Sequence, residues 1–281
     1  MAQAPFSGGI PRFNRVLYAS HAFGSSLLSR ATQAWLIFFY APPKEDGAET
    51  IVPRAALSAI LLALGVLDAI DDPLIGYWSD RTKTRWGRRA PFILFATPFY
   101  AIFFFLFWTP PRDGVFLAAF YITIVVFVQR IVGTMSSGPM EALLPEVART
   151  TSERVSNVSW QFVFGSIGAI GGLVATGLIK DAWGIVAMGA LVAVVAVVSR
   201  YIGLFGVWRY IRDGPEPVRA SFTASLRDAF RNDQFLYFLP TFVLFNTAVL
   251  LLTAALPFYA DVVILGDREE MEVSILGASI M

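Results

Sequence analysis

The sequence has no cysteine, one histidine and few charged residues, and each scarcity excludes a class of protein. Without cysteine there are no disulfides, thiolate metal sites or cysteine nucleophiles. Charged residues make up 15% of the 281 positions, whereas soluble domains carry about a quarter. The net charge of +1 excludes a general nucleic-acid binder. Nothing resembles a nucleophile with its base or a metal site, so we expect neither an enzyme nor a cofactor.

Apolar residues, by contrast, are abundant. They account for 56% of the chain and include 25 Phe and 7 Trp. An apolar stretch of about 20 residues is long enough to cross a bilayer as a helix. The sequence predicts seven such spans, over residues 16–40, 55–79, 91–109, 116–143, 157–180, 183–208 and 235–259. We therefore expect an all-α integral membrane protein embedded in the lipid bilayer.

The distribution of Lys and Arg predicts the orientation of these spans. Basic residues concentrate in the segment before the first span and in alternate loops after it, such as "DRTKTRWGRR". Cytoplasmic loops carry this excess, so the N-terminus is expected in the cytoplasm. A seven-helix receptor or retinal protein, the alternative with the same number of spans, normally has its N-terminus outside. The last span also lacks the lysine that a retinal Schiff base requires.

The second span contains three carboxylates. If the helix ended before Asp68 it would cover only 55–67, about 20 Å, which is too short for a hydrocarbon core of about 30 Å. We therefore expect it to continue through "DAIDDPLIGYWS", with Pro73 inside it. The spacing i, i+3, i+4 places Asp68, Asp71 and Asp72 on one helix face. Each ionised carboxylate that faced lipid would raise the free energy of membrane insertion by about 2.5–3.5 kcal/mol. The three should therefore face a cavity, a cation or a basic partner.

Polar residues of other spans are candidates for contact with these carboxylates. Arg30 lies in the middle of the first span, and Gln129 and Arg130 lie in the middle of the fourth. At about 1.5 Å per residue, both arginines should lie within a few turns of the carboxylates. A purely structural salt bridge is the alternative to a role in ion binding. Oxygen clusters suit hard cations, so the expected ligand is sodium, lithium or a proton.

Two further features favour structural roles. His21, toward the inner end of the first span, is more typical of a packing or interfacial histidine than of a proton relay. Gly168 and Gly172 lie four residues apart in "GSIGAIGGLVATG" of the fifth span. This spacing of small residues is typical of close helix–helix contact in membranes.

At "DAIDDPLIGYWSDRTKTRWGRRAPF" the chain resembles the glycoside–pentoside–hexuronide:cation symporters, the melibiose-permease-like branch of the major facilitator superfamily. "GPMEALLPEVARTTSER" and "LPFYADVVILG" resemble the same family. The resemblance implies twelve helices in two six-helix bundles with binding sites between them. On that fold, residues 1–208 form the first bundle. Residues 209–234 form a cytoplasmic loop with an amphipathic helix at 222–233. Residues 235–281 hold helix seven and the start of an incomplete second bundle, so the chain is expected to be truncated.

The resemblance also implies site residues. It assigns the cation site to Asp68, Asp71, Asp72 and Thr134. Substrate-cavity positions correspond to Ser26, Ser137, Glu141 and Phe162, with Gln129 as a further candidate, although these residue types depart from the family's sugar-binding carboxylates, tryptophan and arginine. The cytoplasmic gating motif corresponds to Gly76, Asp80, Arg81, Arg85, Gly87, Arg88 and Arg89.

The expected function is therefore symport of a sugar-like or glycoside-like solute with sodium or a proton, by alternating access. An amphipathic or lipid-like solute is one alternative, and a non-transporting membrane sensor or scaffold is another. The implied partners are the solute, a monovalent cation, the bilayer and the second bundle; no metal is implied beyond transported sodium. The default location is a bacterial cytoplasmic (inner) membrane.

Overall fold

The computed structural model describes residues 10–42, 50–82, 84–211, 227–228 and 230–259, and the side chains of 67–70 and 249–259 are not described. The chain forms two compact units, Met1–Pro217 and Val218–Met281, which we treat separately. Their boundary falls within the loop predicted over 209–234. Half of the predicted amphipathic helix at 222–233, residues 222–226 and 229, lies outside the described residues.

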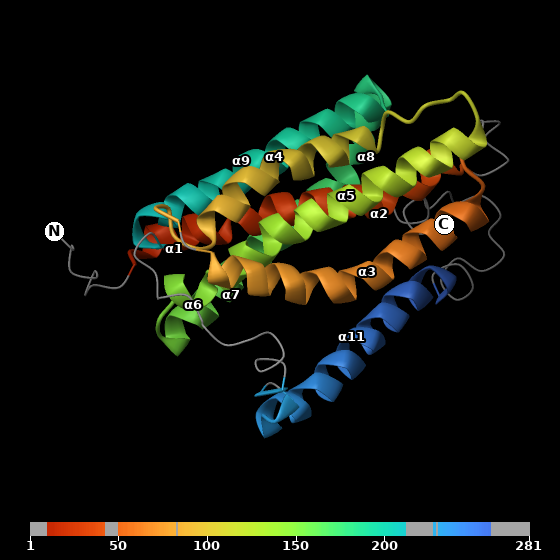
Figure 1. The fold of residues 1–281 in the computed structure, drawn as a ribbon. Coiled ribbons are helices and arrows are strands. Elements are labelled where there is room, and N and C mark those ends of the chain that lie inside the picture. The colour runs from red at the N-terminus through yellow and green to blue at the C-terminus, as the bar shows by residue number, and fades with distance from the viewer. Residues whose placement is uncertain (1–9, 43–49, 83, 212–226, 229, 260–281) are drawn as a thin grey trace. The chain divides into compact units, whose positions relative to one another are not determined.

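The described part of the chain is helical (Figure 1). The first unit contains α1 (Arg12–Ala19), α2 (His21–Tyr40), α3 (Arg54–Arg81), α4 (Ala90–Leu106), α5 (Val115–Ala142), α6 (Leu144–Val147), α7 (Thr151–Ile170), the π-helix η2 (Gly171–Ala175), α8 (Thr176–Trp183) and α9 (Ile185–Ile211). The second unit contains α11 (Asp233–Tyr259). Each of the seven predicted spans coincides with one helix or with consecutive helices, as expected for an all-α membrane protein.

Local sequence explains where several of these helices begin and end. Thr150 caps α7: its hydroxyl accepts from the backbone N–H of Glu153, whose side chain accepts from Thr150 N–H in return. Gly114 and Gly184 precede α5 and α9 with φ of 147° and 84°, values that favour glycine. These turns set where the long helices start.

Helix α3 continues without a break through the three aspartates, with Pro73 inside it. The prediction that the second span includes "DAIDDP" is confirmed, and the ribbon of α3 curves along its length in Figure 1. By length and apolar composition, three described stretches are sufficient to cross a membrane: Val115–Val147, Thr151–Trp183 and Ile185–Ile211. Among the residues whose side chains are described, α3 contributes the shorter apolar stretch Arg54–Val66.

Close packing holds the first unit together. Helix α2 packs against α7 and α9, α4 packs against α5 and α9, and α3 packs against α5. A Cβ atom built on Gly172 would lie 2.7 Å from Arg30 Cβ, and one on Gly168 would overlap the Phe23 carbonyl oxygen. The predicted contact of the Gly168–Gly172 surface with another helix is therefore confirmed, and its partner is α2.

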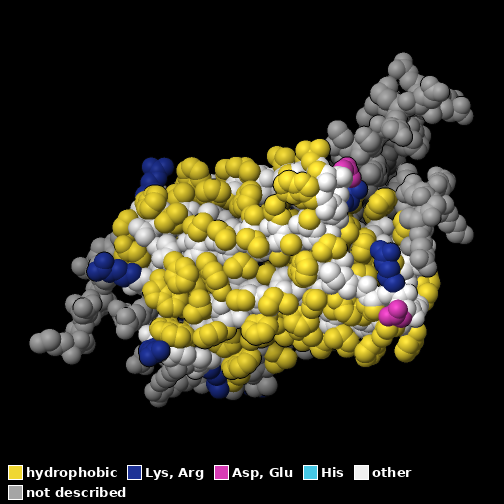
Figure 2. Space-filling model, turned by 90° about the horizontal axis from the view of Figure 1, so that it is seen from above, with side chains coloured by type: hydrophobic (Ala, Val, Ile, Leu, Met, Phe, Trp, Pro, Cys, Tyr) yellow, Lys and Arg dark blue, Asp and Glu magenta, His cyan; other side chains and the backbone are white. Residues whose placement is uncertain are grey.

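The outer surface of this unit is apolar. Large side chains of α4 and α9 are exposed, including Phe95, Phe99, Val198, Ile202 and Phe205. In Figure 2 hydrophobic side chains fill the middle of the face shown, while Lys, Arg, Asp and Glu lie toward its two ends. This distribution fits helices whose middles contact hydrocarbon and whose ends reach the headgroups.

Candidate functional site: a charge network at the helix ends and polar groups of the helices

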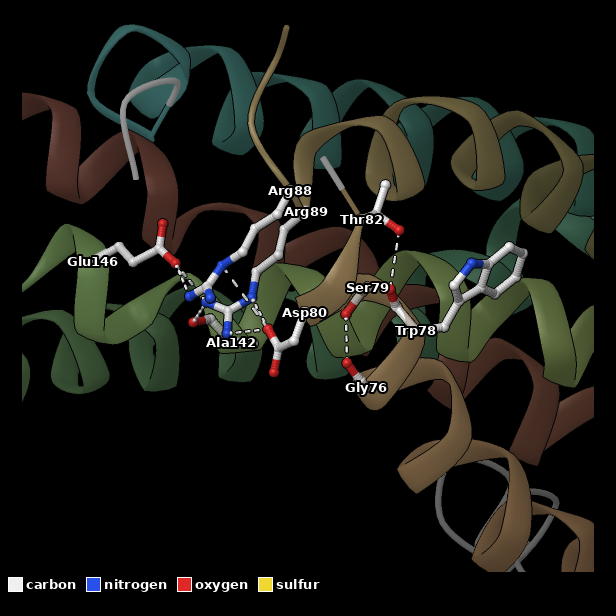
Figure 3. A network of polar contacts seen from close by, with 9 residues as sticks. All are labelled: Gly76, Trp78, Ser79, Asp80, Thr82, Arg88, Arg89, Ala142 and Glu146. Atoms are coloured by element: carbon white, nitrogen blue, oxygen red, sulfur yellow. Dashed lines mark hydrogen bonds and ion pairs between the residues drawn. The ribbon is translucent and has the colours of Figure 1, made fainter. Parts of the chain in front are cut away.

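A network of four charged side chains joins the α3–α4 loop to the corner between α5 and α6 (Figure 3). Arg89 lies at its centre. Its Nη2 lies 2.7 Å from Asp80 Oδ1, and its Nη1 lies 2.7 Å from Glu146 Oε1. Arg89 Nη1 also donates to the Ala142 carbonyl oxygen at the end of α5. One guanidinium therefore connects α3, α5 and α6.

Arg88 reinforces this connection. Its Nη2 donates to Glu146 Oε1 at 2.8 Å, and its Nε lies 4.0 Å from Asp80 Oδ1. The side chains of Arg88, Arg89 and Glu146 are 13%, 11% and 12% exposed, whereas Asp80 is 36% exposed. Ion pairs this shielded are screened little by solvent, so separating them is costly. The network can act as a latch that holds these helix ends together.

The other predicted gating residues lie outside the ion pairs described in Figure 3. Arg81 stacks over the Tyr77 ring at 4.4 Å, and Arg85 stacks over Trp86 at 5.0 Å. Gly87 has a φ of 95° and closes a turn in which its carbonyl accepts from Thr84 Oγ1 at 2.6 Å. The Gly76 carbonyl accepts from Ser79 Oγ at 3.0 Å. Gly87 therefore shapes the turn that delivers the two central arginines.

The predicted cation ligands lie on α3 and α5, which pack against each other. Asp72 is exposed in the first unit, whereas Asp71 and Thr134 are half-buried. Asp68 lies within α3, and its side chain is outside the described set. Among the described residues there is no group of three or more His, Cys, Asp or Glu side chains with metal-site geometry. The cation site therefore stays a prediction based on the α3 register.

The predicted basic and amide partners occupy different environments. Arg30 is exposed, and its Nη1 donates to Gln33 Oε1 at 2.9 Å, one turn along the same helix. Gln129 and Arg130 are half-buried on α5. Gln129 hydrogen-bonds to the side chain of Tyr100 on α4.

The predicted substrate-cavity residues lie in different environments. Ser137 Oγ donates to the Gly133 carbonyl of its own helix at 2.8 Å. Ser26 is half-buried where α2 meets α7, while Phe162 is 75% exposed. Glu141 reaches across to α2, where its Oε1 lies 2.9 Å from His21 Nε2. Their assignment to a cavity is thus a prediction that the described contacts leave open.

The sequence analysis missed a buried arginine in the centre of this unit. Arg200 of α9 is 4% exposed, and its Nη1 and Nη2 donate to Ser136 Oγ and Ser25 Oγ, each at 2.7 Å. Its guanidinium lies 5.5 Å from the centre of the Tyr100 ring. An arginine in the middle of an apolar span is a signal in itself, because such residues mark functional or pairing sites.

Glu146 was missed for a different reason. It lies in a short polar segment after the fourth span, where it appeared only as part of a family-like motif. An acid facing a strongly basic loop on the same predicted membrane side was the available signal.

Comparison with known proteins places this architecture in a family. The profile described as "MFS/sugar transport protein" matches residues 17–281. The chain belongs to this family. The resemblance drawn from the α3 motif is thereby confirmed, and membership in a transporter family fits the apolar helices of a membrane protein.

Several relatives of this family member are named as symporters. It is 29% identical over 218 residues to the uncharacterized symporter sll1374 of Synechocystis sp., covering 73% of the chain and 38% of that protein. It is 27% identical to the inner membrane symporter YicJ of Escherichia coli, covering 65% and 41%. It is 33% identical to the sodium-dependent lysophosphatidylcholine symporter 1 of Gallus gallus, covering 43% and 23%. The chain spans less than half the length of each.

Proposed function

We propose that this protein contributes the first bundle and helix seven of a cation-coupled secondary transporter. The observation that carries the proposal is the continuous helix α3, whose sequence has Asp68, Asp71 and Asp72 at i, i+3 and i+4 and which packs against α5. Three carboxylates within a membrane-spanning helix need a cation or a basic partner to offset their desolvation. Sodium or a proton bound by these residues and Thr134 supplies the driving ion.

The intracellular charge network acts as the gate in this proposal. When the bundle rocks, the ion pairs of Arg88 and Arg89 with Asp80 and Glu146 break on one side of the cycle and re-form on the other. The shared guanidinium of Arg89 makes opening cooperative, because one movement separates two carboxylates from it. The orientation that fits this role has the N-terminus and the network in the cytoplasm.

The proposed solute is a sugar or glycoside. The family description, "MFS/sugar transport protein", supports this class. A lipid-like solute is the second candidate, favoured by the similarity to a lysophosphatidylcholine symporter. A bacterial cytoplasmic membrane fits the inner membrane relative. A sensor or scaffold of the same fold would bind without accumulating solute.

Solute accumulation tests the proposal. Cells that express the protein are given labelled glycosides or a labelled lysophospholipid, with either a sodium or a proton gradient. We expect accumulation of one solute class against its gradient and its collapse when the matching ionophore dissipates the driving ion. Cells without the protein are the control. Binding or signalling without accumulation would favour the sensor alternative.

A further inference from the structure

The contact between His21 and Glu141 requires a proton. His21 Nδ1 lies 2.6 Å from the Tyr18 carbonyl oxygen, which accepts hydrogen bonds and cannot donate them, so Nδ1 carries a hydrogen. His21 Nε2 lies 2.9 Å from Glu141 Oε1. A neutral ring and an ionised carboxylate would bring two lone pairs together at this distance. The geometry therefore needs a second proton, held on Nε2 or on the carboxyl group.

The two partners differ in how far the first unit covers them. His21 is 2% exposed, whereas the Glu141 side chain is 61% exposed in the first unit. The histidine is thus fixed inside the bundle, and the carboxylate provides the path by which the shared proton can enter or leave. A packing histidine would need neither the carboxylate nor this exposed side.

The buried guanidinium of Arg200 lies close enough to the pair to act on Glu141. The two hydroxyl groups that accept from Arg200 pass their own hydrogens onward: Ser25 Oγ donates to the His21 carbonyl at 3.1 Å, and Thr97 Oγ1 lies 2.7 Å from Ser136 Oγ and donates to Ile93 O. Because both of these acceptors are hydroxyl groups, neither contact pairs the charge of Arg200 with a carboxylate. Glu141 is the carboxylate that attracts it electrostatically.

The surrounding charged and titratable groups are few. Among the described residues, Arg200 of α9 acts on Glu141, and Glu146 of α6 and Arg89 of the loop before α4 act on Tyr18 beside the pair. Tyr100 of α4 acts on Arg200. Asp80 of α3 is held by Arg89, and α7 contributes the uncharged Gln161 beside Tyr18. Arg200 therefore brings a permanent positive charge that acts on Glu141 and whose described hydrogen bonds go to hydroxyl groups.

From this geometry we propose that His21 and Glu141 form a proton-binding site, separate from the aspartates of α3. The pair holds one proton between Nε2 and Oε1. When that proton passes to water, the Nε2–Oε1 contact becomes repulsive and Glu141 is drawn toward Arg200. Because Glu141 adjoins Ala142, whose carbonyl accepts from Arg89, the proton would bias the intracellular network. A role of this proton in ion-coupled transport rests on the proposed symport. The presence of the proton between His21 and Glu141 does not depend on that function.

His21 is the only histidine in the chain, so its ring nitrogens can be observed without overlap. The protein is labelled with an NMR-active nitrogen isotope at histidine, placed in lipid nanodiscs and compared at one fixed pH. In the wild type we expect Nδ1 protonated and Nε2 carrying or sharing a proton. In Glu141→Gln we expect Nδ1 still protonated and Nε2 changed to a bare acceptor of the Gln amide.

Glu153→Gln is the matched control, because Glu153 is a carboxylate whose partners are Arg15 and the N-terminus of α7. It should leave the His21 signals unchanged. The proposal is overturned by a bare Nε2 in the wild type or by identical Nε2 signals in the wild type and Glu141→Gln. Failure of the proposed transport function is distinguishable from failure of this proposal, because a protein that transports nothing would still show the shared proton on His21.

Discussion

Replacing Gly168 by alanine is expected to disrupt the packing of α7 on α2. The added Cβ would overlap the carbonyl oxygen of Phe23, and a backbone atom cannot rotate away as a flexible side chain does. Overpacking of this kind costs about 1–3 kcal/mol and more where backbone must move. Alanine's better helix propensity returns at most about 1 kcal/mol. The net loss should reach about 2 kcal/mol or more.

Thermal unfolding in detergent and the yield of monodisperse protein measure this effect. Gly65→Ala in α3 is the matched control, because nothing lies within 4 Å of a Cβ at that position. It should leave stability unchanged or raise it slightly. Equal melting temperatures for Gly168→Ala and Gly65→Ala would show that the α2–α7 contact is looser than described.

Replacing Arg89 by alanine is expected to open the charge network of Asp80, Arg88, Arg89 and Glu146. Glu146, 12% exposed, would keep only Arg88 as its partner, and the Ala142 carbonyl would lose its donor. Removing one member of a buried ion pair costs about 3–5 kcal/mol. The Asp80 contact adds less, because Asp80 is 36% exposed and solvent screens it.

The absence of cysteine from the chain makes a direct test possible. Ser79 is 2% exposed at the end of α3, so a Ser79→Cys reporter should resist a water-soluble alkylating reagent. Combined with Arg89→Ala, the reporter should be labelled several-fold faster. Arg85→Ala is the control, since Arg85 is exposed over Trp86. Equal labelling rates in the two combined variants would mean that Arg89 does not hold this end closed.

Helix positions were predictable from sequence because they depend on properties of single stretches. Length and hydropathy placed all seven spans, and the shortness of 55–67 showed that the second helix must include Asp68 to Asp72. Likewise, the spacing of Gly168 and Gly172 indicated a close contact before its partner was known.

Pairing between helices was less predictable, because it depends on the rotation and tilt of each helix. His21 and Glu141 are separated by 120 positions and meet only because α2 and α5 present them to each other. The same holds for Arg200, whose serine partners come from α2 and α5. The π-helix η2 inside the fifth span, which packs against α2, is likewise a feature that the sequence alone does not reveal.

The central claim is that the α3 carboxylates bind the driving cation, and direct cation binding tests it. Purified protein in nanodiscs is titrated with radioactive sodium while protons taken up or released are recorded. We predict saturable binding of one of these cations. Its affinity should fall at least about tenfold in Asp72→Asn, which removes an anionic oxygen ligand, and should be unchanged in Asp113→Asn, whose aspartate lies exposed in the loop before α5. Wild-type affinity in Asp72→Asn would contradict the account.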